Sequence, residues 1–505
     1  MTMDPFLGDQ EALVVEHGRV LAVGDRDLLQ AYPGIAVEPL AGRTLVPGFI
    51  DAHNHLSIAA LHPLWADLSA VRTVDELALA LRAQAAREPD ARWIRGFGWN
   101  EATTGLLLDR AQLDALGLER PVIVAHYTLH QCVVSSAGLA ELEIGRTTPD
   151  PPGGIIARGL DGAPSGLLIE RAWSDAHARS VAGYHDPDRW NDLFTARARQ
   201  LLRDGITCIH DAACTPSAER VYRSLHRRHA LPLSVVLMPH GEALLGRPDD
   251  ERLDGPPTGE GDEWLRVGPV KLFADGGVAP GMQVTIAGQR GEPLGILFPG
   301  LAEDARRAVA RGFDVAVHAI GNLGLAEAIA ALAEAARSSP ATDRRFRIEH
   351  VCFASPRQLA DLAALDFIGV VQPGFVHHVG RAVEGVPFEE EIWLAFDAML
   401  RAGMRLAASS DDPCAFHQPL RTAAVGATRR TASGGVLGPE QALGYEEWLR
   451  LYTAGAAYAG RQEYERGTLT PGKRADLVVL DGPLDPEHPP RVAETWVAGE
   501  RVFGD

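Results

Sequence analysis

Cysteine is scarce in this chain of 505 residues. Its five cysteines are odd in number and include no C-x-x-C pair, so we expect free thiols in a reducing cytosol. No uninterrupted apolar stretch is long enough to span a bilayer. The first ten residues are acidic and lack the basic-then-apolar layout of a signal peptide. Together these absences predict a cytoplasmic protein without a membrane segment.

Positive charge is also in short supply. The 48 lysines and arginines are outnumbered by 67 acidic residues, and the formal net charge is -19. Nucleic acids and anionic membranes both require clustered lysine and arginine, so neither is expected as a partner. The chain contains no internal repeat and no extended low-complexity tract. A large enzyme that acts on a small-molecule substrate fits this composition.

Eight short apolar runs recur along the chain and are typical of buried parallel strands. They occupy residues 46–50, 206–210, 231–238, 267–270, 313–317, 346–349, 367–371 and 404–410. Helical patterns lie between them at 301–311, 323–337, 355–365 and 389–402. Ser355 and Gln358 fit a capping box, and Gly312 and Gly403 stand where helices should stop. Eight alternating strands and helices predict an α/β fold of the (β/α)₈, TIM-like barrel type.

Metal-binding side chains follow several of these runs. In chain order they are His53, His55, Lys271, His318, His350 and Asp411. Taken singly, each has a simpler explanation, such as a solvated strand end, a turn or a hydrogen-bonded core histidine. A barrel, however, brings the carboxyl ends of its strands together around one site. Imidazole, carboxylate and a carboxylated amine suit a pair of divalent metals there. The ordered set therefore predicts a metal centre. His210 and His240 also end predicted strands, but structural roles are favoured for both.

The remaining parts of the chain predict additions to the barrel. Alternating runs at 12–15, 19–23, 475–480, 495–497 and 501–503 suggest that both ends build one small β-sandwich domain, from residues 1–47 and 465–505. The barrel would occupy residues 48–464. Residues 56–200 are too many for an ordinary connection after the first strand, and they carry a capped helix at 73–87 and a strand at 121–125.

This insertion is expected to cover the mouth of the barrel and to control substrate specificity. Trp99 and His130 are the candidates for substrate contacts within it. For Trp99, packing inside the insertion is an equally good explanation. For His130 the functional interpretation is favoured.

Two segments, Val46–His55 and Gly467–Leu477, resemble the amidohydrolase superfamily. Within it the chain is most similar to the family-3 amidohydrolases, which include N-substituted formamide deformylases. The further segments that carry this resemblance are Gly96–Asn100, Pro151–Gly154, Gly162–Leu168, Val270–Gly276, Val317–Asn322, Arg347–His350 and Ser410–Pro413. Asn100 and Asn322 depart from the family pattern, in which aspartate is usual, but neither is expected to remove a metal ligand.

The resemblance implies a role for each candidate. His53, His55 and Asp411 hold one divalent metal ion, and His318 and His350 hold the second. Lys271, converted to a carbamate by CO₂, bridges the two, and a metal-bound hydroxide is the nucleophile. Asp411 takes the proton of that water and passes it to the leaving nitrogen; the family pattern selects it over the adjacent Asp412. Zinc is the first choice of metal, with manganese or iron as alternatives, and relatives suggest a homodimer.

The predicted function is hydrolysis of a C–N bond in an amide, an N-formyl amine or an N-acyl amine. Deamination and ester or lactone hydrolysis on the same scaffold are the first alternatives. Deaminating relatives usually carry a glutamate soon after the fifth-strand histidine, whereas His318 is followed by Ala319 and Ile320. A non-catalytic binding or regulatory protein is the alternative from another class, and the complete ligand set argues against it.

Overall fold

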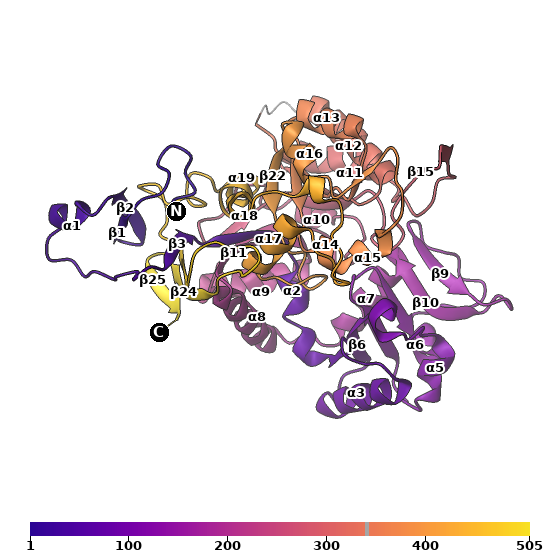
Figure 1. Ribbon diagram of the computed structural model, residues 1–505. Helices are drawn as coiled ribbons and strands as arrows, with labels where there is room; N and C mark the ends of the chain where they lie inside the picture. The colour runs from indigo at the N-terminus through magenta and orange to yellow at the C-terminus, as the bar shows by residue number, and fades with distance from the viewer. Residues whose placement is uncertain (339–342, 505) are drawn as a thin grey trace.

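The computed structural model describes residues 1–338 and 343–504 and has a mixed α/β fold (Figure 1). Its centre consists of parallel strands in two sheets, with helices packed around them. In the described part of the chain, every helix is too short or too polar to cross a membrane.

The central strands run in the order β13-β12-β11-β4 in one sheet and β14-β17-β18-β20-β22 in the other. Their bounds are β4 (Phe49–Asn54), β11 (Ile206–Cys214), β12 (Ser234–Pro239), β13 (Leu265–Val267), β14 (Val270–Phe273), β17 (Val315–Ala319), β18 (Phe346–His350), β20 (Ile368–Val371) and β22 (Arg405–Ala408). Every residue of β4 and β11 is buried, as expected for strands that are covered on both faces.

Each predicted apolar run overlaps one of these strands, with one exception. The run at 267–270 straddles the end of β13 and the start of β14, which belong to different sheets. Pro269 lies between them and has no N–H to donate to a strand ladder, so the ladder breaks there.

The two sheets meet along the edge between β4 and β22. The backbone N–H of Asp411 donates to the carbonyl of His53 at 2.9 Å, and that of His55 donates to Asp412 at 2.8 Å. Strands β12 and β14 contact each other at the opposite junction. The strand ladder therefore runs through sheets of four and five strands, and closure into a single barrel stays a prediction.

The longer helices lie between the strands in sequence. They are α3 (Val74–Arg87), α7 (Arg171–Ala182), α8 (Pro187–Arg203), α9 (Pro216–Arg227), α11 (Leu301–Ala310), α12 (Asn322–Ser338), α13 (Pro356–Ala364) and α17 (Pro419–Thr428). The capping boxes predicted for α3 and α13 are both present. Gly312 and Gly403 both have a φ of +89°, the left-handed conformation that ends helices.

The helix predicted at 389–402 is wrong in its first half. Residues Ile392–Trp393 form β21, which pairs with β19 (Phe353–Ala354), and only Phe396–Arg401 form a helix, α16. Leu394 has a φ of +46° and donates its N–H to the carbonyl of Cys352. This positive φ is incompatible with a continuous helix.

The two chain ends lie close together (Figure 1). Strands β3 (Thr44–Pro47), β23 (Leu477–Leu480), β24 (Val492–Val497) and β25 (Glu500–Phe503) form one sheet, and β1 (Ala12–Glu16) and β2 (Arg19–Gly24) form a separate hairpin. Val20, Ala475 and Leu477 share a small apolar core. The predicted small β domain is thus seen in part, as a four-stranded sheet with a hairpin beside it.

Residues between β4 and β11 build a further sheet of their own, in the order β5-β6-β7-β8-β10-β9. Its strands are β5 (Ala66–Asp67), β6 (Ile94–Trp99), β7 (Val122–His126), β8 (Gln131–Val134), β9 (Gly154–Arg158) and β10 (Pro164–Glu170), accompanied by α4 (Glu101–Thr104), α5 (Arg110–Ala115) and α6 (Ser136–Glu141). Leu77, Leu81 and Val124 belong to a core that is separate from the main one. One face of this sheet therefore has a core of its own, while Ile123 and Cys132 belong to the main core, and the insertion into a barrel stays a prediction.

Candidate metal centre

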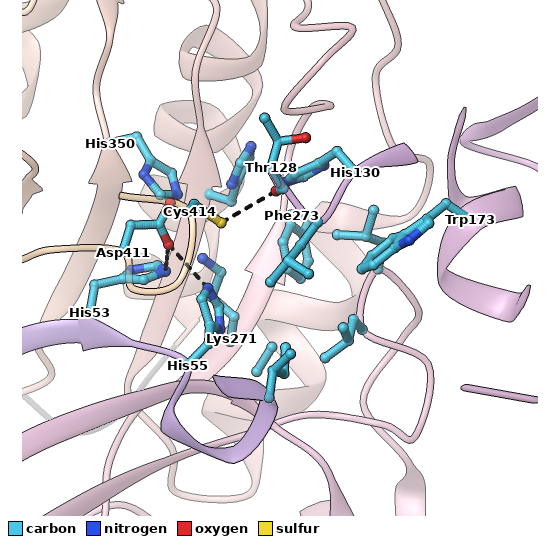
Figure 2. Close-up of a pocket in the computed structure, with 16 residues that line it drawn as sticks. His53, His55, Thr128, His130, Trp173, Lys271, Phe273, His350, Asp411 and Cys414 are labelled. Carbon is cyan, nitrogen blue, oxygen red and sulfur yellow. Dashed lines mark hydrogen bonds and ion pairs between the residues drawn. The ribbon is translucent and has the colours of Figure 1, made fainter. Parts of the chain in front are cut away.

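The six predicted metal ligands lie around one pocket (Figure 2). Five come from the carboxyl ends of strands or from residues just beyond them: His53 and His55 at β4, His318 in β17, His350 at the end of β18 and Asp411 after β22. The sixth, Lys271, is the second residue of β14. Five are buried and His55 is nearly so. The structure therefore brings together the whole set that the sequence predicted.

Asp411 stands at the meeting point of the first two histidines. Its Oδ1 is 3.1 Å from Nε2 of His55 and 3.4 Å from Nε2 of His53, and the ligand atoms of these three residues lie within 4.8 Å of one another. The ring centroid of His350 is 4.9 Å from that of His53 and 4.5 Å from that of His318. The two pairs of histidines thus form one continuous cluster.

Protein groups outside the predicted ligand set pair with Nδ1 in three of these rings. Nδ1 of His53 is paired with the Glu349 carboxylate, Nδ1 of His55 lies 2.9 Å from the Ala212 carbonyl, and Nδ1 of His350 lies 2.9 Å from Oε1 of Gln372. Nε2 of His53 is buried and makes no hydrogen bond within the described chain. A buried imidazole nitrogen without a partner is costly, and a divalent ion is the group that this arrangement fits.

His318 adds a second nitrogen of this kind. Its Nε2 is buried without a hydrogen bond among the described residues, and it lies 3.9 Å from Oδ1 of Asp275. That carboxylate accepts the backbone N–H groups of Ile320, Gly321 and Gly281 at 2.8 to 3.0 Å. Asp275 thereby fixes the loop after β14 to the loop after β17, beside the histidine.

Lys271 is 1 % exposed. Burial lowers the pKa of its amine to about 8, against the nearby carboxylates of Glu349 and Asp411, which raise it. A substantial share of the amine is therefore neutral near physiological pH, and the neutral amine is the form that reacts with CO₂. This property meets one requirement of the predicted carbamate.

Behind the histidines lies a buried charge network that the sequence analysis missed. Arg347 donates to Glu349 at 2.8 Å, to the carbonyl of Ala52 at 2.7 Å, and lies 3.0 Å from Nδ1 of His210. Arg347 and Glu349 stand two residues apart on β18, so their side chains point to the same face. This spacing of two charged residues in a predicted buried strand was the sequence feature that could have indicated the network. Both histidines for which structural roles were favoured contact protein groups: His210 contacts Arg347, and Nδ1 of His240 is 2.7 Å from the Lys271 carbonyl.

We expect Glu349→Gln to weaken metal binding about 10- to 100-fold, the usual cost of losing a carboxylate that orients a metal-binding histidine. The substitution keeps the size of the side chain but removes the charge that pairs with His53. Zinc affinity measured by chelator competition is the readout. Glu219→Gln is the matched control. Glu219, like Glu349, is a buried carboxylate with charged partners, in this case Arg223 and Arg252, but it does not line the pocket. Parental affinity in Glu349→Gln would contradict this role.

Asp412 points away from the cluster. One nitrogen of Arg197 lies 2.6 Å from both of its carboxylate oxygens, and Nδ1 of His417 is 3.5 Å away. Burial raises the pKa of Asp411, but the hydrogen bond from His55 and the neighbouring imidazoles outweigh it and hold that pKa well below its usual range. Of the two adjacent aspartates, only Asp411 faces the histidines as an anion.

His417 makes the stability of this corner depend on pH. Burial lowers its pKa, but hydrogen bonds to Asp204 and Asp412 outweigh that effect and raise the pKa to about 9, from 6.5. The folded protein therefore holds a proton that the unfolded chain has lost at pH values between these two. The stabilisation is complete below about pH 6.5 and disappears as the pH rises through about 9, with an upper limit of about 3 kcal/mol.

We expect His417→Gln to melt at a lower temperature than the parent at pH 6, and the difference to shrink at pH 10. Arg197 opposes the charged form of His417, so the effect is expected to fall below the upper limit. Thermal unfolding at the two pH values is the measurement, and the exposed His488 provides a control substitution. An equal difference in melting temperature at both pH values would contradict the prediction.

The two predicted substrate contacts have different outcomes. His130 lines the pocket, and its ring centroid is 5.3 Å from that of His318. Trp99 is packed in the separate core of the insertion, where its indole N–H donates to the Leu106 carbonyl at 2.9 Å, and it is not among the described residues that line the pocket. For Trp99, the structure therefore supports packing inside this segment and not contact with the substrate. Trp173 of α7 and Phe273 of β14 line the pocket instead.

The two departures from the family pattern lie outside the pocket. Asn100 caps α4 by accepting the N–H of Ala102 at 3.0 Å. Asn322 accepts the N–H of Gln283 and donates from Nδ2 to the Gln283 carbonyl and to Glu391. An aspartate at position 322 could not donate these two hydrogen bonds, so the local contacts explain the amide.

Comparisons with known proteins place this chain in a family and show related folds. The model of the amidohydrolase family matches residues 37–503. An N-substituted formamide deformylase of Arthrobacter pascens is 31% identical over 96% of this chain and 92% of its own length. The protein LONG AFTER FAR-RED 3 of Arabidopsis thaliana is 26% identical over 99% of this chain and 90% of its own. A crystal structure of an uncharacterized metal-dependent hydrolase from Pyrococcus horikoshii superposes with a TM-score of 0.72 at 24% identity, covering 94% of this chain and 93% of that chain.

Proposed function

This chain belongs to the amidohydrolase family, and from that premise we propose that it hydrolyses a C–N bond in an amide, an N-formyl amine or an N-acyl amine. The observation that carries the proposal is the cluster of six predicted ligands around one pocket, in which Nε2 of His53 and of His318 have no hydrogen-bond partner among the described residues. The formamide deformylase similarity supports the choice of a C–N bond.

Two divalent ions, with zinc as the first choice, are proposed for this site. His53, His55 and Asp411 would hold one ion, and His318 and His350 the other. Lys271, as a carbamate, would bridge them, because a carbamate offers two anionic oxygens where an ammonium would repel both ions. When bound, such ions polarise a carbonyl group and lower the pKa of water.

The chain's own residues supply proton transfer and water exclusion. Asp411 is held as an anion and faces the histidines, so it can accept a proton from the attacking water and deliver it to the leaving nitrogen. Trp173, Phe273 and Leu129 line the pocket beside it and keep bulk water away from the reacting carbonyl. Glu349 holds His53 in one tautomer throughout.

The same family resemblance extends to the architecture. We propose that the two central sheets are the halves of a (β/α)₈ barrel formed by residues 48–464, with residues 56–200 as its insertion. The bonds that join β4 to β22, and the contact between β12 and β14, support this closure.

A hydrolysis screen on metal-loaded protein tests the function. We expect turnover of formamides or other N-acyl amines, and weaker or no turnover of ureas, lactones and carboxylic esters. Metal content is measured in the same samples, and chelated protein serves as the control. Retained metal without hydrolysis of any amide would contradict the proposal and favour a binding or regulatory protein. Faster turnover of esters or lactones would favour that alternative reaction.

A further inference from the structure

Glu170 and His130 form a pair where the insertion meets the pocket. Glu170 is the last residue of β10 and is fully buried, and His130 directly precedes β8. Oε2 of Glu170 lies 2.6 Å from Nδ1 of His130. Oε1 accepts the backbone N–H groups of Val278 and Ala279 at 3.0 and 3.1 Å. Both carboxylate oxygens therefore have partners.

These contacts fix the tautomer of the imidazole. Backbone N–H groups can only donate, so Oε1 must be an acceptor, and at Oε2 the carboxylate accepts from the imidazole at 2.6 Å. Nδ1 of His130 is then the donor. The N–H of Gly277 also lies 3.1 Å from Nδ1, but this nitrogen has one in-plane position, and the shorter contact to Glu170 takes it. Nε2 keeps its lone pair.

The loop after β14 packs closely against both side chains of this pair. A Cβ at Gly276 would lie 2.5 Å from Oε1 of Glu170, and one at Gly277 would lie 2.5 Å from Nε2 of His130. The loop after β14 can thus approach both side chains only because it carries two glycines. Glu170 itself has a φ of +52°, a conformation that is unfavourable for a residue with a side chain.

The free nitrogen of His130 belongs to the pocket. The His130 ring lies 5.3 Å from His318 and is stacked on Trp173 at 6.5 Å, measured between centroids. Figure 2 shows His130 between the metal-binding cluster and Trp173. Within the described chain, Nε2 has no hydrogen-bond partner, so it is available to a ligand.

We propose that Glu170 is a positioning residue that makes His130 a hydrogen-bond acceptor for an N–H group of the substrate. The preferred substrates are then secondary amides, which carry a hydrogen on the nitrogen of the scissile bond. Tertiary amides and esters offer no such hydrogen and place a carbon or a lone pair against Nε2. This inference rests on the proposed C–N hydrolase function and narrows its substrate class.

Matched substrate pairs test the inference. Each pair consists of an N-alkylformamide and its N-methylated counterpart, and kcat/KM is measured for both. We expect the parent to favour the N–H member about 10- to 100-fold, the range for a hydrogen bond to a buried group. In Glu170→Gln, the amide oxygen keeps the bonds from Val278 and Ala279, so its NH₂ faces His130 and Nε2 carries the hydrogen. The preference should then fall to near unity or reverse.

Two further variants separate this role from a general structural one. His130→Leu removes the acceptor and should also abolish the preference for the N–H member. Glu101→Gln is the matched control, because Glu101 pairs with His126 at 3.0 Å in the same insertion but outside the described pocket lining. It should keep the parental ratio. A changed ratio in the first two variants alone, with metal content unchanged in all, supports the inference.

The outcomes that overturn the inference differ from those that overturn the function. A parental ratio near unity, or a parental ratio retained in folded, metal-loaded Glu170→Gln, refutes the role of the pair while amide hydrolysis stands. If no amide is turned over, the proposed function fails, and the affinities of the same pairs, measured by calorimetry, decide the inference. Equal affinity for both members then refutes it, and tighter binding of the N–H member supports it.

Discussion

Replacing Lys271 with alanine is expected to give a folded protein that has lost metal and at least about 100-fold in activity, a loss no smaller than that for an outer partner of a ligand. Lys271 is buried among four histidines and Asp411, where an ammonium would repel two dications. The proposed carbamate on the same side chain would be anionic and could bind both ions. Alanine would remove this bridge and leave the other proposed ligands in place.

The chain offers a clear control for this experiment. Only two of its 48 basic residues other than histidine are lysines, Lys271 and Lys473. Lys473 lies near the C-terminal strands, donates to Thr468 at 2.6 Å and is remote in sequence from every predicted ligand. Lys473→Ala should retain metal and activity. Arginine cannot replace Lys271, because a guanidinium stays protonated and does not react with CO₂.

Two measurements identify the carbamate itself. Protein loaded with metal in ¹³C-bicarbonate should show one carbamate carbon signal that is present in Lys473→Ala and missing in Lys271→Ala. A short carboxylic acid added to Lys271→Ala should restore part of the metal and part of the activity, because its two oxygens can occupy the bridge. An unmodified Lys271 in metal-loaded, active protein would refute the bridge and favour a mechanism with a single metal.

The residues that line the pocket as candidate metal ligands could be predicted because each depends on a short local pattern. An apolar run defines a buried strand, and the residue that follows it lies at the carboxyl end of the sheet, whatever the neighbouring strands are. His53, His318 and Asp411 were found in this way. At residues 267–270 the predicted strand was wrong, because Pro269 divides the run between two sheets, but Lys271, which follows the run, still lines the pocket.

Other features depend on contacts between distant segments. Glu170 meets His130 only because β10 lies beside β8, and the pairing of β19 with β21, not local propensity, ends the helix predicted at 389–402. Trp99 could belong to the pocket or to the insertion core, and the register of β6 beside β7 decided for the core. Sequence spacing does not contain this information, because it is fixed by which strands become neighbours.

Asp411→Asn is expected to lower turnover by about 100-fold or more, the scale of losing a positioned proton-transfer group. Asparagine has nearly the same shape and can still lie against His53 and His55, so the fold should be retained. Its amide cannot accept and release a proton as the carboxylate does, and it removes one negative charge from the cluster. Single-turnover kinetics on metal-loaded protein measures the effect, with metal content determined on the same sample.

Asp412→Asn is the control variant for this experiment. Asp412 is adjacent in sequence but pairs with Arg197 and His417, so its substitution should lower stability more than turnover per metal-loaded site. Asp411 has a φ of +60° and lies beyond the end of β22, so the backbone turns between the two residues, and one aspartate faces the histidines while the other pairs with Arg197. Near-normal turnover in Asp411→Asn with full metal content would remove Asp411 from proton transfer, and a larger loss in Asp412→Asn at equal metal content would reverse the assignment of the two residues.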